Sequence, residues 1–273
     1  MVTEQRVQAS STSCRGDSVG DMPTLLEVDQ VYKRFGGLEI LSGVSFSVGR
    51  GEVFGLVGPN GAGKTTLFNC ILGIVSVDSG KIILDGRDIS NLPVWKRASL
   101  GMARTFQRLE LFSGMTPREH LIIAYRTHKH SGSILKDLIG HGLPTQEELD
   151  RVASILELFG LMDVADVPVE ALSLGHGRLV ELARAFILDP FVLMMDEPSS
   201  GLDAVETARI SDMLERLRGN GRSCAIIVEH DLDMVIKVAS QIAVLDSGSI
   251  IAQGDPREVL NDPEVRKAYL GKI

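Results

Sequence analysis

A glycine-rich stretch near residue 60 has the residue types and spacing of a phosphate-binding loop. It reads GPNGAGKTT and fits the pattern G-x-x-x-x-G-K-[ST] without a mismatch. An apolar run at 53–57 precedes it and a helical pattern from Thr66 to Leu72 follows. Inward-pointing backbone N–H groups and the positive end of a helix are therefore expected to face one anion. The predicted nucleotide contacts of this phosphate loop are Gly58, Pro59, Asn60, Gly61, Ala62, Gly63, Lys64, Thr65 and Thr66.

Lys64 and Thr65 carry the side-chain chemistry of the phosphate loop. Lys64 is expected to neutralise charge on the β- and γ-phosphates, and the Thr65 hydroxyl to be a ligand of Mg²⁺. The alternative is a glycine-rich strand-to-helix turn that binds nothing, and the coincidence of strand, complete motif and helix argues against it. GTPases, kinases, helicases and transport ATPases share this motif, so it predicts a nucleoside triphosphatase without naming the reaction.

Two later strand ends carry groups that could act on such a nucleotide. An apolar run at 192–195 ends in Asp196 and Glu197, and a carboxylate beside a phosphate-loop strand is expected to face Mg²⁺. Glu197 could then polarise an attacking water as a general base. A β-rich run at 223–228 leads to His230, at the end of a strand where ligands bind in α/β sheets. The competing interpretations are an acidic turn for the pair and a structural or surface histidine for His230.

A serine at the start of an amphipathic helix forms a second candidate anion site. Residues 172–176, LSLGH, precede apolar residues at helical spacing. Ser173 can cap this helix, and the turn offers free backbone N–H groups. The simpler interpretation is an N-cap and nothing more. We call residues 172–176 the signature turn. Because the sequence has no second nucleotide motif, an anion bound at this turn would have to come from outside the chain.

Aromatic residues in an expected exposed turn are candidates to stack on a base. Tyr32 and Phe35 lie in the stretch 32–37, between predicted antiparallel strands at 25–28 and 44–48. A flat apolar ring can stack on adenine. An aromatic that anchors the loop on the core explains the turn equally well.

The elements that would position these residues follow an α/β pattern. Strand patterns at 242–245 and 249–252 indicate a hairpin, whereas residues 117–160 change to helical periodicity, with a capping box that begins at Thr145. Residues 1–22 are rich in Ser, Thr, Gly and Gln and predict a disordered tail. We therefore expect a tail, a nucleotide-binding core with flanking antiparallel strands, and an inserted helical lobe.

Composition narrows the class of protein. The 273 residues are 44% hydrophobic and 23% charged, which is typical of one large globular domain or two lobes. A net charge of −8 argues against general affinity for nucleic acid or for an anionic membrane surface. No apolar run reaches membrane-spanning length, the N-terminus lacks the apolar core of a signal peptide, and three distant cysteines suggest neither disulfides nor a metal site. A cytosolic protein is expected.

Taken together, the motifs resemble the ATP-binding subunit of an ABC transporter over about residues 25–273. The resemblance is carried by the phosphate loop, Gln107, the signature turn, Asp196–Glu197, the stretch SGLD at 200–203 and His230. It implies a P-loop NTPase core of RecA-like fold, an antiparallel β subdomain and an inserted α-helical subdomain at about 108–178, all within residues 23–273. It also implies ATP and Mg²⁺ as cofactors and the hydrolysis of ATP to ADP and phosphate.

Within one chain, the resemblance gives each motif a role. It implies that Phe35 stacks on adenine and that Gln107, which alone carries little information, reaches Mg²⁺ and the attacking water. Asp196 would hold Mg²⁺, and Glu197 would be the catalytic base. His230 would lie at the γ-phosphate.

The resemblance also implies a dimer in which the signature turn faces a nucleotide bound to the other subunit. Ser173 and Gly175, with His176 beside them, would contact the γ-phosphate bound to a second ATP-binding subunit, identical or merely similar. Asp203 would couple the two sites. The other implied partners are the permease subunits of a membrane transporter, which would place this chain at the cytoplasmic face of the membrane as a peripheral subunit.

Three stretches look like the branched-chain amino acid importer type within that superfamily. They are GMARTFQ at 101–107, the long helical insertion, and the ending EVRKAYLG at 264–271. The resemblance implies uptake of branched-chain amino acids or related amino-acid or amide solutes, delivered by an external solute-binding protein. The alternatives are a lipid or lipopolysaccharide exporter, a soluble ABC ATPase without a transport role, and a non-catalytic binding module.

The signature turn departs from the usual Leu-Ser-Gly-Gly-Gln. Leu174 stands in place of the first Gly, as is common in the importer type. His176 stands in place of the Gln and is expected to alter the strength or the pH dependence of the cross-dimer contact. Gly177 follows where a second polar residue is usual.

Overall fold

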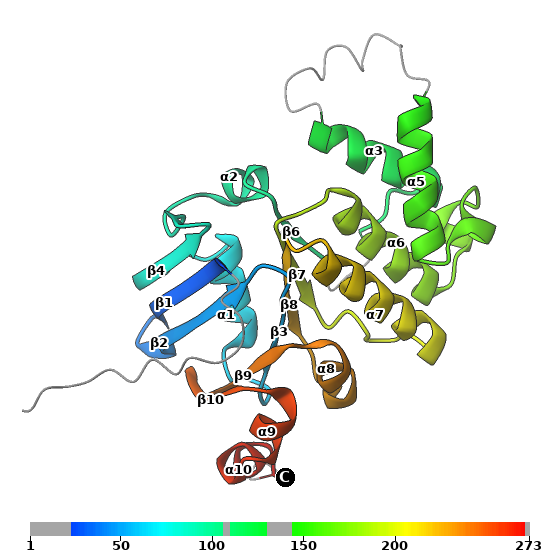
Figure 1. The fold of residues 1–273 in the computed structure, drawn as a ribbon. Helices are drawn as coiled ribbons and strands as arrows, with labels where there is room; N and C mark the ends of the chain where they lie inside the picture. Colours follow the sequence, from blue (N-terminus) through cyan, green and yellow to red (C-terminus); the bar gives the residue numbers. More distant parts are fainter. Residues whose placement is uncertain (1–22, 106–109, 130–143, 271–273) are drawn as a thin grey trace, which may run out of the picture.

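The computed structural model describes residues 23–105, 110–129 and 144–270. Its elements form two sheets and a separate group of helices (Figure 1). The predicted disordered tail at 1–22, with Cys14, lies outside the described residues. Cys70 and Cys224 are buried and free.

A six-stranded sheet carries the phosphate loop. Its strands are β3 (Val53–Val57), β6 (Met102–Arg104), β7 (Val192–Asp196), β8 (Cys224–Val228), β9 (Gln241–Asp246) and β10 (Ser249–Gly254). Their order is β10-β9-β3-β8-β7-β6, and all pairs are parallel except the β9–β10 hairpin. Because parallel strands end at one edge, the segments that follow β3, β7 and β8 meet there.

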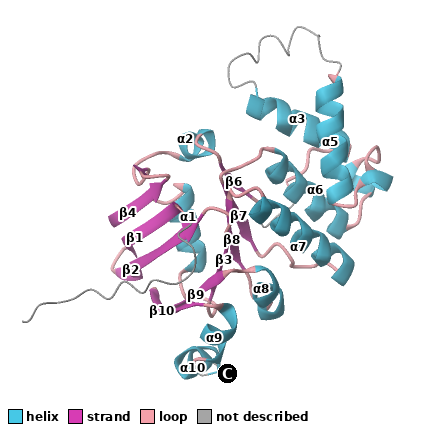
Figure 2. Cartoon of the chain, viewed as in Figure 1, coloured by secondary structure: helices cyan, strands magenta, loops and turns pink. Residues whose placement is uncertain are grey.

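Both faces of this sheet are buried, which explains why its strands read as continuous apolar runs. Phe54 and Leu56 of β3 face one core cluster, and Val53 and Val57 face the other, as the two-residue period of a strand requires. Helix α1 (Lys64–Leu72) covers the first face. Helices α6 (Leu174–Ile187), α7 (Ala204–Gly219) and α8 (Leu232–Val238) cover the second (Figure 2).

A four-stranded antiparallel sheet packs on the far side of α1. Its strands, in the order β2-β1-β4-β5, are β2 (Leu38–Gly49), β1 (Thr24–Phe35), β4 (Ser79–Leu84) and β5 (Arg87–Asp88). The ring of Phe46 stacks on that of Phe54, with centroids 4.8 Å apart, so the two sheets share one core. This confirms the fold class expected from the sequence.

The helical lobe is built from α3 (Pro117–Lys129), α5 (Gln146–Leu158) and α6. Leu121, Val152 and Leu156 are buried between them. The capping box at Thr145 is confirmed: its side chain accepts from the Glu148 N–H, and the Glu148 carboxylate accepts from the Thr145 N–H. The exact limits of this lobe, predicted at about 108–178, stay a prediction.

The remaining described α-helices are α2 (Val94–Ser99), α9 (Pro256–Asn261) and α10 (Pro263–Leu270), and two short 3₁₀ helices, η1 (Met162–Val164) and η2 (Val169–Ala171), lie between α5 and α6. No helix among the described ranges is long and apolar enough to cross a membrane.

The prediction of an exposed turn at 32–37 was wrong. Strand β1 continues through Phe35, and only residues 36–37 form the turn to β2. Lys33 is 7% exposed, and its Nζ donates to Asp78 Oδ1 at 2.7 Å. The carboxylate supplied just before β4 allows a lysine to occupy an inward position, so the strand extends further than its apolar residues indicate.

Candidate nucleotide site

The phosphate loop joins β3 to α1 and contains two positions that require glycine. Gly58 has a φ of 149°, and a Cβ there would lie 2.0 Å from the Leu245 carbonyl oxygen. Gly63 has a φ of 104°, and a Cβ there would lie 2.9 Å from the Ile40 carbonyl oxygen. Glycine reaches these backbone conformations without strain. The loop can therefore press against β9 and β2 while it wraps.

Lys64, at the start of α1, folds back over the phosphate loop. Its Nζ donates to the carbonyl oxygens of Gly58 at 2.6 Å and Pro59 at 3.0 Å, and the residue is 7% exposed. Burial lowers the pKa of Lys64, and the charges of Glu197 and Asp196 oppose that shift. An anion in the loop would compensate the buried ammonium.

Asp196 ends β7 in a buried position at the same edge of the sheet. Its burial, followed by the charge of Glu197, raises the pKa of the Asp196 carboxyl. The positive charges of Arg104, Lys64 and His230 act in the opposite direction. A buried carboxylate with a raised pKa is typical of functional sites.

The oxygen donors at this edge fit Mg²⁺. Within the described part of the chain, no three His, Cys, Asp or Glu side chains cluster in a way that could hold a metal ion. Mg²⁺ needs no such cage, because it keeps waters and phosphate oxygens as ligands. The Thr65 hydroxyl and the Asp196 carboxylate are hard oxygen donors of the right kind. Gln107, the third predicted ligand, lies outside the described residues.

Glu197 follows β7 in a strained backbone conformation that its surroundings hold. Its φ is 50°, which non-glycine residues rarely adopt, and its N–H donates to the Val228 carbonyl oxygen at 2.8 Å. Glu197 Oε1 lies 3.0 Å from His230 Nε2. The two predicted catalytic side chains therefore lie next to each other at this edge of the sheet.

Glu229 also belongs to this edge, although the sequence argument gave it no role. It is 3% exposed, and its Oε1 accepts from both the N–H and the Oγ of Ser199, at 2.9 and 2.7 Å. Its Oε2 accepts from the His230 N–H at 3.2 Å. Glu229 thereby ties the loop after Glu197 to the segment that carries His230. An acid directly after an apolar strand was the available signal.

The signature turn lies elsewhere, at the N-terminus of α6. Ser173 is the N-cap, and its Oγ accepts from the His176 N–H at 3.1 Å. The same oxygen lies 2.8 Å from His176 Nδ1. Ser173 is exposed and Leu174 is 57% exposed. Both of these hydrogen bonds stay within the turn, and among the described residues none joins the Ser173 or His176 side chain to the phosphate loop.

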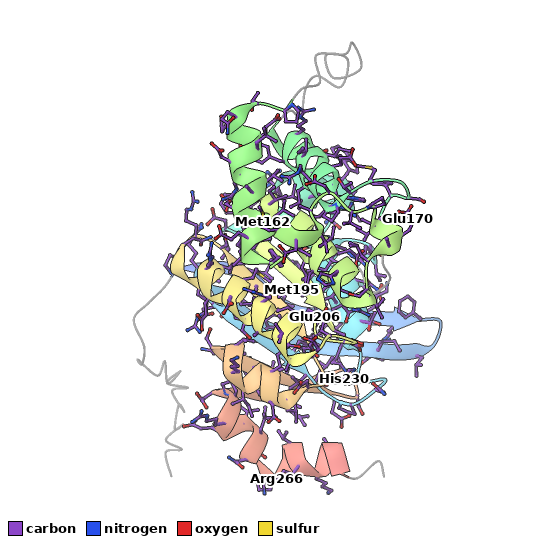
Figure 3. The ribbon with its side chains drawn as sticks, turned by 90° about the vertical axis from the view of Figure 1, so that its right-hand side faces the viewer. Met162, Glu170, Met195, Glu206, His230 and Arg266 are labelled. Atoms are coloured by element: carbon purple, nitrogen blue, oxygen red, sulfur yellow. The ribbon has the colours of Figure 1, made fainter. Side chains whose placement is uncertain are left out.

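Gly175 links the signature turn to the loop that carries Asp203. A Cβ on Gly175 would lie only 2.0 Å from Glu206 Oε1. Glu206 Oε2 in turn accepts from the Asp203 N–H at 3.0 Å, and Asp203 caps α7. Figure 3 shows Glu206 and His230 below the helical lobe on the same face. Glu206 was missed by the sequence argument, although Asp203 and Glu206 have the spacing of a capping box.

Phe35 lies at the end of β1, next to the hairpin that borders the phosphate loop. It pairs with Leu38 across the turn, and the nearby Ile40 carbonyl contacts the Gly63 position. The ring is exposed on one side, and Lys33 Nζ lies 5.3 Å from its centroid. Its role in adenine stacking stays a prediction.

A groove of about 330 Å³ lies between α3 and α6, beside β6. Phe112 and Ile123, which are 57% and 47% exposed, line it together with Arg184. The Phe112 N–H donates to His120 Nε2 at 2.9 Å, and His120 Nδ1 lies 2.9 Å from the Thr116 carbonyl oxygen. These contacts assign the proton to His120 Nδ1. Burial lowers the pKa of His120, which is consistent with that neutral form.

The site has a glycine-rich loop between a buried strand and a helix, and a buried lysine and an acid pair lie at the same edge of the sheet. These features define a P-loop NTPase. Residues 41–200 match the family described as ABC transporter. Residues 249–272 match the family described as branched-chain amino acid ATP-binding cassette transporter. The chain belongs to the ABC transporter family.

Known relatives match the chain over nearly their whole length. The high-affinity branched-chain amino acid transport ATP-binding protein LivG of Salmonella typhimurium is 37% identical over 91% of this chain and 98% of its own. The lipopolysaccharide export system ATP-binding protein LptB of Haemophilus influenzae is 33% identical over the same shares. The crystal structure of the ADP conformation of an ATP-binding cassette of an ABC transporter superimposes with a TM-score of 0.77. It is 32% identical and covers 92% of this chain and 100% of that one.

Proposed function

We propose that this chain is the ATP-hydrolysing subunit of an ABC transporter that takes up branched-chain amino acids or related amino-acid or amide solutes. The observation that carries the enzymatic part is the common edge of β3, β7 and β8. There Lys64, Asp196 and the neighbouring side chains of Glu197 and His230 come together. A phosphate-binding loop without acids would hold a nucleotide and leave it intact.

The residues at this edge divide the chemistry among them. Lys64 and the backbone N–H groups of the phosphate loop hold the β- and γ-phosphates, and Phe35 stacks on the adenine. Thr65, Asp196 and Gln107 hold Mg²⁺, which when bound neutralises phosphate charge.

In this proposal, Glu197 accepts a proton from the attacking water, and His230 orients the groups that react. The His230 ring lies beside the carboxylate, with Nε2 3.0 Å from Oε1, and the Glu197 backbone is left-handed. In the proposed complex, His230 also contacts the γ-phosphate. General-base catalysis of this kind accelerates a reaction by roughly 10²- to 10⁴-fold.

A second copy of the chain, or a similar subunit, would complete each site. The turn of Ser173, Gly175 and His176 offers a hydroxyl and backbone N–H groups to an anion that its own chain does not deliver. Two chains placed head to tail would sandwich each ATP between the phosphate loop of one and the signature turn of the other. ATP would then favour the closed dimer by its differential affinity, and hydrolysis would release it.

The groove between α3 and α6 is the proposed contact for a permease helix. Phe112 and Ile123 present apolar surface there, and His120 holds the Phe112 backbone in place. An amphipathic helix recognises such a groove through its apolar side. Movement of the helical lobe on dimer closure would thereby reach the membrane subunits.

The similarity to LivG and the match of the C-terminal 249–272 segment support branched-chain amino acids as the solute class. The similarity to LptB supports a second candidate, a subunit of a lipopolysaccharide exporter. Co-purification from detergent extracts separates the two. A permease that takes up leucine when reconstituted with this chain and a solute-binding protein supports import, and a permease that extracts lipopolysaccharide supports export.

Phosphate release by the purified protein with ATP and Mg²⁺ tests the enzymatic part. We expect Glu197→Gln to reduce turnover by about 10²-fold or more while ATP binding persists, because the general base is removed and the phosphate contacts remain. Glu215→Gln, at an exposed position on α7, is the matched control and should turn over like the wild type. Unchanged turnover in Glu197→Gln would remove Glu197 from the base role.

A further inference from the structure

The Ser173 hydroxyl has two neighbours on its own helix, and together they decide what it can offer to a ligand. A serine hydroxyl has one proton to donate and two lone pairs to accept with. The His176 N–H, at 3.1 Å, uses one lone pair in the N-cap. His176 Nδ1, at 2.8 Å, must either donate into the second lone pair or accept the hydroxyl proton.

Only one of these two arrangements suits an anion. If Nδ1 is bare, the hydroxyl proton points at the histidine, and Ser173 presents no donor to a phosphate oxygen. If Nδ1 carries a proton, both lone pairs of Ser173 Oγ are occupied and the hydroxyl proton is left to point outward. Phosphate oxygens only accept, so Ser173 can donate to an anion at the turn only in the second arrangement.

We propose that His176 is a positioning residue for Ser173: its Nδ1–H donates to Ser173 Oγ and thereby directs the hydroxyl proton toward a phosphate oxygen held by the partner subunit. This inference rests on the proposed composite site. It assigns His176 an action through Ser173, in place of the direct nucleotide contact that the sequence argument implied. The half-buried ring and the N-cap contact, which fix His176 three residues after Ser173, keep Nδ1 beside the hydroxyl.

Two substitutions separate hydrogen bonding from shape at this position. Asparagine carries its amide nitrogen on the same atom of the side chain as Nδ1, so His176→Asn keeps an N–H donor next to Ser173 Oγ. His176→Leu has a similar branch without a donor or an acceptor. In both variants the backbone N–H at position 176 still completes the N-cap.

ATP-driven dimerisation in a Glu197→Gln background, measured by analytical ultracentrifugation, provides the readout. We expect His176→Asn to dimerise like the parent and His176→Leu to dimerise about tenfold more weakly or worse, as for a lost hydrogen bond to a charged group. In a Ser173→Ala background, His176→Leu should have little further effect, because the residue acts through Ser173. Equal dimerisation of the Asn and Leu variants, or an undiminished Leu effect without Ser173, would overturn the proposal.

A spectroscopic measurement tests the proton directly and does not depend on the stability of the variants. Nitrogen NMR of selectively ¹⁵N-histidine-labelled protein reports which ring nitrogen is protonated, and His176→Asn identifies the His176 signal. We expect a proton on Nδ1 in the ATP-bound dimer, and a bare Nδ1 there would refute the proposal. If the parent does not dimerise with ATP at all, the composite site itself fails, which distinguishes that outcome from a failure at His176.

Discussion

The phosphate loop and the signature turn are both helix N-termini, but they are built differently. The phosphate loop is backed by the six-stranded sheet and has a buried lysine and two carboxylates within reach. The signature turn is exposed and offers the Ser173 hydroxyl, the His176 ring and backbone N–H groups, with no acidic residue in the first turn of α6. One surface has the groups to hold a nucleotide and to attack it, whereas the other can only complement a nucleotide that is already held.

This contrast also appears in strain and uncompensated charge. At the phosphate loop, burial shifts the pKa values of Lys64 and Asp196 away from their usual values, and Glu197 has a left-handed backbone. At the signature turn, an ordinary N-cap satisfies the helix terminus. Surroundings that maintain strained or desolvated groups generally mark the place where chemistry occurs. The difference supports the proposal that catalysis occurs at the phosphate loop and that the signature turn recognises a nucleotide held by the partner subunit.

Lys64→Met is expected to have the largest effect, because it acts directly on the phosphate loop. It removes the buried cation from the phosphate loop, and losing a charged hydrogen-bond partner weakens binding by about 2–5 kcal/mol. We expect ATP affinity of the monomer to fall by roughly 30-fold or more in calorimetric titrations. Lys237→Met, at an exposed position on α8, is the matched control. Wild-type affinity in Lys64→Met would mean that the backbone N–H groups alone hold the phosphates, as at the signature turn.

Arg97→Met tests how firmly α1 is anchored behind the phosphate loop. The guanidinium is 2% exposed, and its Nη1 donates to the carbonyl oxygens of Cys70 and Ile71, at 2.8 and 2.6 Å. Its other nitrogens donate to carbonyl oxygens of Leu92 and Ser90, both at 2.8 Å. Methionine leaves these carbonyls unpaired, so we expect the free energy of unfolding to fall by about 2–4 kcal/mol.

Urea denaturation of the nucleotide-free protein measures this change. Arg222→Met replaces an exposed arginine and should stay within about 0.5 kcal/mol of the wild type. A small loss in Arg97→Met would show that the cost of burying an arginine there nearly cancels its four hydrogen bonds.

Gly175→Ala tests the role of the signature turn in dimerisation. The new methyl would displace the Glu206 carboxylate, which now accepts from the Asp203 N–H. We expect ATP binding to the monomer to be unchanged and ATP-driven dimerisation of the Glu197→Gln background to weaken by roughly 30-fold, as for the loss of a cap of about 1 kcal/mol at each of two sites.

A double-mutant cycle with Glu206→Ala tests the cause, because removing the carboxylate should relieve much of the effect of Gly175→Ala. Gly219→Ala, where a Cβ would meet nothing within 4 Å, is the matched control. Full additivity in the cycle would show that the methyl acts on the bound phosphate and not through Glu206.

The sequence was most informative where the chemistry is local. The phosphate loop, the caps at Thr145 and Ser173, and the acids at the end of β7 are set by spacing of a few residues, and the structure has these elements where they were expected. Strand alternation likewise predicted the two antiparallel flanking strands, although not their full length.

The contacts that the sequence did not reveal join residues far apart in the chain. Glu229 holds Ser199 across 30 positions, and Arg97 holds the Cys70 carbonyl across 27. In neither case does local spacing identify the partner, because an acid or an arginine on an element of this kind is usually exposed. The choice of partner depends on how the elements pack, and a single sequence does not encode that packing in a readable pattern.

Asp196→Asn gives the smallest expected effect. It tests whether the buried carboxylate of Asp196 destabilises the nucleotide-free protein. Burial and the charge of Glu197 raise the pKa of Asp196 in the folded protein above its unfolded value. Between those two pKa values the folded state binds more protons than the unfolded state, so stability falls as pH rises through that window. The ionised carboxylate therefore destabilises the nucleotide-free fold at neutral pH, and asparagine should raise the thermal midpoint at pH 7 in the presence of a chelator.

The increase in thermal midpoint caused by Asp196→Asn should depend on pH. Its sign is opposite to the loss expected when a carboxylate of an ordinary salt bridge is removed. The increase should shrink on acidification and vanish below about pH 3.9, the usual pKa of an aspartic acid, where Asp196 is protonated in both states. Asp212→Asn, at an exposed position on α7, controls for the loss of a negative charge. A lower midpoint for Asp196→Asn at pH 7 would mean that attraction to Lys64, Arg104 and His230 outweighs the burial of Asp196. The phosphate loop would then be stable without a ligand, as the signature turn is.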